Sequence, residues 1–295
     1  MRSRGFTLIE AIMTVLLMGI LALATIPFLR LATDAYLDAQ ARADLTARGR
    51  LAVERLAREV RAAVPNSVQT VAGGQGIEFV HAGYGTRYAA QADNFGQDPD
   101  CGTGTAFNDV NRRFRARATR SALYALEVDA AGVVAALLAA GGAPALVIGN
   151  TTPGDLTAAA ADDRSWIGLT GTTATSCASD KSDDGTVLEF AGGKSFPTAS
   201  IGHRLLIADR TVEVGRSGGA LRWHERDGVA TAIYNNGSAD WSSADPALVD
   251  GVGAVAFSYT PGSIGGAGIL GIELQLSDGR VSVVLHQEVQ VRNVP

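Results

Sequence analysis

The sequence has few cysteines, few aromatic residues and no excess of positive charge. Its two cysteines, Cys101 and Cys177, are too few for a disulfide scaffold and lack the spacing of a zinc site. The formal net charge of −5 argues against a basic nucleic-acid-binding surface, so no nucleic-acid partner is expected. Aromatic residues make up 6% of the 295 residues and apolar residues 46%, which predicts a core of mainly aliphatic side chains.

Charged residues are also absent from the segment 11–29, which directly follows Glu10. Together with the residues before it, this run has about the length of a helix that crosses a hydrocarbon core of roughly 30 Å. Arg2 and Arg4 precede it, which predicts that the N-terminus stays in the cytoplasm and that the rest of the chain is exported.

Three kinds of N-terminal segment compete for this run. Ala22-Leu23-Ala24 could serve as the cleavage site of a secretory signal, and a plain signal anchor needs only the basic start and the apolar span. Neither explains Glu10, because an acidic residue costs up to about 2.5–3.5 kcal/mol at the centre of a membrane helix and is by default functional. Cleavage between Gly5 and Phe6 would create an α-amino group that, on one subunit, can pair with Glu10 of another in a low-dielectric bundle.

The string from Gly5 to Glu10, GFTLIE, closely resembles the processing motif of type IV prepilins and pseudopilins. The resemblance implies that a prepilin peptidase cuts after Gly5, that the new N-terminal Phe6 is methylated, and that Glu10 helps to register an incoming subunit. The runs 49–61 and 64–68 are similar to large minor pilins, most of all to a biogenesis subunit of the mannose-sensitive haemagglutinin pilus.

This resemblance covers about the first 70 residues and implies a structural role without cofactor or catalysis. The expected protein is a minor pilin of a type IV pilus that acts in fibre initiation or at the tip. Its expected partners are other minor and major pilins, the prepilin peptidase, the inner-membrane assembly platform and the lipid bilayer, with the globular domain in the periplasm. A minor pseudopilin of a type II secretion system is the main alternative, and a signal-anchored surface enzyme is a remote one.

The N-terminal helix is expected to continue well beyond the apolar run. Apolar residues recur at helical spacing from Leu37 to Val64, and three acid–base pairs four residues apart, Asp38–Arg42, Asp44–Arg48 and Glu54–Arg58, favour the same helix. Pro65 predicts its end. A helix from Phe6 to Val64 would be about 90 Å long, so only its second half is expected to dock on the rest of the chain.

The chain after Pro65 predicts strands and glycine-rich turns. The expected strands are Ile77–Val80, Val187–Phe190, Arg204–Ala208, Thr211–Val214, Ala220–Glu225, Val229–Tyr234 and an antiparallel meander of Val252–Tyr259, Ile269–Leu276 and Val281–Val291. Long loops are expected over 91–182, with a strand and a short helix within Leu123–Leu138.

The predicted class is therefore α+β and pilin-like. Residues 1–5 are expected to form the leader, 6–29 the transmembrane and polymerisation helix, 30–64 its amphipathic continuation and 65–295 a β-rich periplasmic domain. Pro27 is expected to kink or open the helix, since it lacks a backbone donor.

A bridge between Cys101 and Cys177 is expected in an exported domain, and two free buried thiols are the alternative. It would close a loop of about 77 residues, worth roughly 4–5 kcal/mol in the loop-entropy model.

Four short motifs resemble catalytic or ligand-binding patterns, but each departs from the pattern it resembles. Gly215–Gly219 fits the G-x-S-x-G pattern and Gly266–Gly271 the dinucleotide pattern, but strand-like runs follow both, which predicts turns. Gly193-Lys194-Ser195 lacks the earlier glycine of a phosphate loop. Asp180, Ser182 and Asp184 begin like a calcium loop, but Ala191 stands where the bidentate glutamate belongs, so the segment is expected to be a solvated turn.

Overall fold

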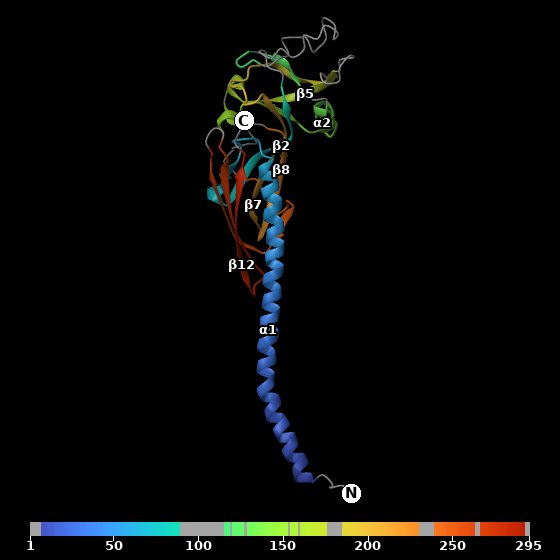
Figure 1. Ribbon diagram of the computed structural model, residues 1–295, viewed down its shortest axis with the longest axis vertical. Helices are drawn as coiled ribbons and strands as arrows, with labels where there is room; N and C mark the ends of the chain where they lie inside the picture. Colours follow the sequence, from blue (N-terminus) through green and yellow to red (C-terminus); the bar gives the residue numbers. More distant parts are fainter. Residues whose placement is uncertain are drawn as a thin grey trace.

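The protein consists of one long helix and a β-rich part that covers only one half of it (Figure 1). The computed structural model describes residues 7–88, 115–118, 120–126, 129–152, 154–158, 160–175, 185–229, 239–262 and 266–292. Helix α1, Leu8–Arg61, precedes two antiparallel sheets, so the class is α+β with a pilin-like layout, as predicted.

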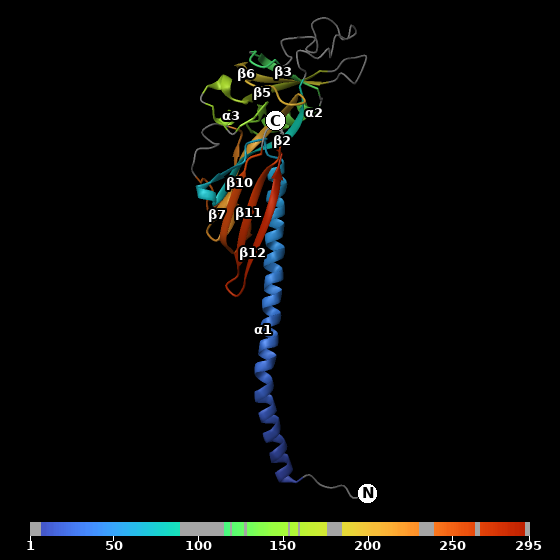
Figure 2. The same cartoon turned by 60° about the vertical axis from the view of Figure 1, so that its left-hand side comes forward.

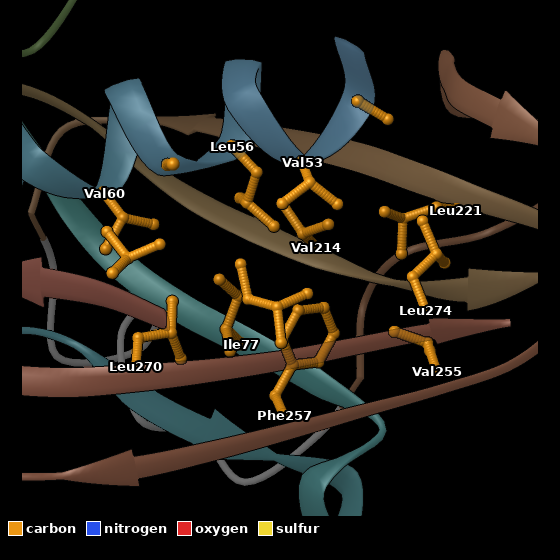
Figure 3. Packing of buried hydrophobic residues seen from close by; sticks show 14 of the residues in the cluster. Val53, Leu56, Val60, Ile77, Val214, Leu221, Val255, Phe257, Leu270 and Leu274 are labelled. Atoms are coloured by element: carbon orange, nitrogen blue, oxygen red, sulfur yellow. The ribbon is translucent and has the colours of Figure 1, made fainter. Parts of the chain in front are cut away.

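The second half of α1 is docked on the sheets through a stripe at helical spacing. Its buried residues are Leu45, Gly49, Ala52, Val53, Leu56, Ala57 and Val60. Figure 3 shows Val53, Leu56 and Val60 pointing into the core. Gly49 permits the closest approach, because a Cβ there would lie 2.3 Å from Leu285 Cδ1. The predicted docking of this half is confirmed, although Leu37, at the start of the predicted stripe, is 40% exposed.

Helix α1 ends at Arg61, three residues earlier than predicted. Val64 donates its backbone N–H to Val80 O at 2.8 Å, and Ala82 N–H donates to Ala62 O at 2.9 Å. These backbone bonds to the neighbouring strand compete with a further helical turn. Pro65 therefore predicts the C-terminal end of α1 only to within a few residues.

The larger sheet is organised around one long strand, β7, Arg204–Ser217, which merges two predicted strands. Along one edge it pairs with β2, Gly76–Arg87, and along the other with β4, Ala145–Val147, in its first part and β8, Ala220–Asp227, in its second. The remaining strands extend these pairings: β1 Gln69–Val71, β3 Arg120–Ala125, β5 Trp166–Thr175, β6 Gly185–Lys194 and β9 Ala247–Asp250.

The second sheet is the predicted three-stranded meander. Strands β10, Val252–Thr260, β11, Gly268–Ser277, and β12, Ser282–Val291, pair in that order, all antiparallel. Strand β12 runs beside the upper part of α1 in Figures 1 and 2. Phe257, Leu270 and Leu274 from this sheet meet the helix stripe in the core (Figure 3).

The prediction of long loops over 91–182 was wrong for much of the described part. Strands β3, β4 and β5 lie there, as do helices α2, Asp129–Ala139, and α3, Gly154–Thr157, and a short 3-10 helix at Ala161–Asp163. The expected strand and helix within Leu123–Leu138 are confirmed as β3 and α2. In the predicted strand Val229–Tyr234, Val229 is not extended into a strand, and the other residues lie outside the described part.

One of the three predicted ion pairs along α1 forms among the described residues. Arg48 Nη2 lies 3.0 Å from Asp44 Oδ2. Asp38 instead pairs with Arg280 Nη2 at 2.9 Å, because the β11–β12 turn brings this arginine beside the helix. The pair thus links α1 to the meander.

Candidate assembly helix

The first half of α1 projects beyond the sheets and is exposed along its whole length (Figures 1 and 2). Large apolar side chains cover it on every side, from Leu8, which is 81% exposed, to Leu31, which is 71% exposed. This is the helix among the described residues that is long and apolar enough to cross a membrane, and none of its apolar window is buried within the chain. Such a surface needs lipid or other apolar helices around it.

Three threonines within this apolar half have hydroxyl groups that are satisfied inside the helix. Thr14 donates to Ala11 O at 2.8 Å, Thr25 to Leu21 O at 2.6 Å and Thr33 to Leu29 O at 2.8 Å. A hydroxyl bonded in this way does not need water, so these residues do not oppose burial in lipid. The sequence prediction missed this feature, although a threonine inside a helix can bond to a carbonyl three or four residues earlier.

Helix α1 runs through Pro27 without interruption, so the predicted opening of the helix does not occur. Both views show a gentle bend in the projecting half (Figures 1 and 2). Proline removes one backbone donor, and a bend without a break accommodates that loss.

Glu10 lies in the first turn of α1, followed by 19 uncharged positions up to Arg30 (residues 11–29). The helix N-terminus carries a partial positive charge, which favours a carboxylate at this position. The carboxylate therefore stands at the start of an apolar rod, where a cation from a neighbouring helix can reach it.

Several predicted site residues lie outside the described residues. They are Gly5 and Phe6 of the cleavage site, Cys101 and Cys177, and Asp180, Ser182 and Asp184 of the weak calcium candidate. The disulfide and the processing site remain predictions. Within the described part, no group of three or more His, Cys, Asp or Glu residues could hold a metal ion.

The short motifs adopt the structures expected of turns and strands. Ser217 ends β7, and Gly218 and Gly219, with φ of 59° and 74°, form the turn into β8. The pattern that resembled a serine-hydrolase elbow is thus a hairpin. Gly268, inside the dinucleotide-like pattern, begins strand β11 and not a helix.

Lys194 of the phosphate-loop-like motif is turned into the protein. It is 2% exposed, and its Nζ donates to Arg164 O at 2.6 Å and to Ala161 O at the short 3-10 helix. Burial lowers its pKa to about 8, against the opposing effect of Asp162. The buried amine therefore holds the segment 161–164 against the end of β6.

Length and apolar composition alone would fit a secretory signal as well as a pilin helix. Residues 1–26 match the family model of the prokaryotic N-terminal methylation motif. The match supports a type IV pilin or pseudopilin. No curated protein and no solved structure matches the chain. The motif implies processing by a prepilin peptidase and assembly with other pilins. The apolar half of α1 fits the membrane anchoring that is typical of type IV pilins.

Proposed function

We propose that the protein is a minor pilin of a type IV pilus that assembles through the first half of α1 in fibre initiation or at the tip. The observation that carries the proposal is an apolar helix that is exposed on all sides and has a single acid, Glu10, in its first turn, within a methylation motif. The β-rich part supports a minor role, because it is large and major subunits are usually much shorter. Before assembly the subunit resides in the inner membrane, with its N-terminus in the cytoplasm and the β-rich part in the periplasm.

The role is mechanical rather than catalytic. Its partners are other minor and major pilins, the prepilin peptidase and the inner-membrane assembly platform. Two motifs that resemble enzyme signatures lie in a hairpin and a strand, where they cannot present a nucleophile elbow or a dinucleotide-binding helix.

Processing is the first test. We expect the mature protein to lack residues 1–5 and to begin with N-methylated Phe6. The measurement is mass spectrometry of the N-terminal peptide from cells, with a strain lacking the prepilin peptidase as control. An intact Met1, or a cut after Ala24, would contradict the pilin-like interpretation as a whole.

The distinction between a pilus and a secretion pseudopilus needs a separate experiment. Deleting the gene should reduce the number of surface fibres severely, because an initiating subunit is needed once per fibre. The measurement is a count of fibres by electron microscopy, together with the amount of secreted protein in the medium. Normal fibres with impaired secretion would favour a minor pseudopilin of a type II secretion system instead.

A further inference from the structure

A cavity of about 350 Å³ lies where strands β2, β4 and β7 meet, close to the end of α1. Strand β2 is labelled just above that end in Figure 2. Ligand sites in proteins commonly measure about 300–1,000 Å³, so the cavity can hold one amino-acid side chain or a single sugar. Its lining combines aliphatic residues with three arginines, Arg87, Arg204 and Arg292.

Two of these arginines face each other directly. Arg87 of β2 and Arg204 of β7 are register partners in an antiparallel pair, and both are exposed. Like charges in this position repel and destabilise the sheet. Within the described part of the chain, none of the three guanidinium groups has an acidic partner. Three unpaired cations gather here although the whole chain has a formal net charge of −5.

The face that carries the arginine pair continues into an apolar surface. Side chains alternate along a strand, so Gly85 lies on the same face as Arg87, and Leu206 on the same face as Arg204. Gly85 and Leu206 are partners in the register, and Val147 of β4 is the partner of Leu206 on its other side. A Cβ at Gly85 would lie 2.9 Å from Leu206 Cδ2, so the glycine lets the Leu206 side chain pack against β2 beside the charges.

The wall of the cavity is held in place by a buried hydrogen-bond network. Asn150 donates from Nδ2 to Pro65 O at 2.5 Å and accepts the Ser165 hydroxyl at 2.8 Å through Oδ1. Its backbone O accepts from Asn66 Nδ2 at 2.9 Å. Arg87 is itself oriented by a bond from its Nε to Gly202 O at 3.2 Å. The site is therefore largely preformed.

We propose that this cavity binds a carboxylate carried on a short, partly apolar stem. The planar guanidinium fork matches a carboxylate, which would relieve the repulsion between Arg87 and Arg204. The stem would lie over Gly85, Leu206 and Val147. An acidic side chain of another protein subunit and an acidic sugar both offer this chemistry.

The test uses the full mature chain in detergent and two matched pairs of probes. They are N-acetyl-glutamate α-amide with the neutral N-acetyl-glutamine α-amide, and glucuronate with glucose. Titrations followed by saturation-transfer NMR should show at least one carboxylate binding roughly tenfold more tightly than its neutral counterpart. Preference for the glutamate derivative assigns the site to a protein partner, and preference for glucuronate to a glycan.

Variants then locate the binding. Arg87→Gln and Arg204→Gln should each weaken carboxylate binding roughly tenfold. Arg50→Gln removes the same charge from an exposed position of α1 and should leave binding unchanged. Equal binding by the Arg87→Gln and Arg204→Gln variants, or no preference for either carboxylate, would overturn the proposal. Binding that appears only in a chain shortened after Arg292 would also overturn it, because the cavity would then belong to the chain's own tail.

A second readout separates a ligand site from a structural role. Without ligand, Arg204→Gln should raise the melting temperature, because it removes the cross-strand repulsion from Arg87. A lower melting temperature would mean that the arginine stabilises the fold, and the proposal would fail.

Discussion

Replacing Arg226 by methionine is expected to lower the free energy of unfolding by about 3–5 kcal/mol, because it leaves buried carboxylates without their counter-charge. Arg226 extends from β8 and places Nη2 3.0 Å from Glu78 Oε1 and in contact with Glu213 Oε1. Both glutamates are 1% exposed and face each other directly across the β2–β7 pair. Without the guanidinium group, the carboxylates of Glu78 and Glu213 would lie side by side in a buried position with no positive charge between them.

Matched variants can show that charge, and not packing, causes this loss. Arg222→Met changes another arginine on β8, whose side chain donates, among the described residues, only to the backbone carbonyls of Ser217 and Asp245, and should cost about 1 kcal/mol. Adding Glu213→Gln to Arg226→Met should recover part of the stability. The measurement is denaturant unfolding of the full chain in detergent. A loss for Arg226→Met no larger than that for Arg222→Met would refute the interpretation.

Replacing Glu10 by glutamine is expected to leave the fold intact and to impair assembly. The side chain keeps nearly the same volume and lies far from the docked half of α1, so folding and insertion should be normal. In the assembled bundle, a partner's N-terminal amine would lose its counter-charge. An unpaired buried charge costs about 3–5 kcal/mol, which weakens association at least about a hundredfold.

The measurement is co-purification of the Glu10→Gln subunit with its partner minor pilins, alongside a count of surface fibres at equal protein level. Glu54→Gln is the matched control, since it neutralises an exposed acid of the same helix outside the apolar half. The control should assemble normally. If the Glu10→Gln subunit forms normal complexes and fibres as well, Glu10 does not pair with a partner's amine in this protein.

Features that depend on neighbouring residues could be predicted from the sequence. A helix repeats every few residues, so the uncharged run after Glu10 and the apolar stripe from Leu37 to Val64 predicted which half of α1 projects and which half docks. The meander was equally visible, because the alternation in β11 and the short turns beside it are local. The candidate assembly site depends on such local features, and so do the threonine hydroxyl bonds, which span three or four positions but were not predicted.

The tertiary structure decided the features that depend on strand register. Backbone bonds to β2 end α1 at Arg61. Strand β7 pairs with β4 in its first part and with β8 in its second, which merges two predicted strands into one. The bond from Arg226 to Glu78 joins residues 148 positions apart, and no local pattern indicates such a pair. The same holds for Arg87 and Arg204, since a slip of one residue would turn them to opposite faces. The sequence by itself thus determined the apolar helix, its methylation motif and the meander, whereas only the packed sheets decided which distant charges meet.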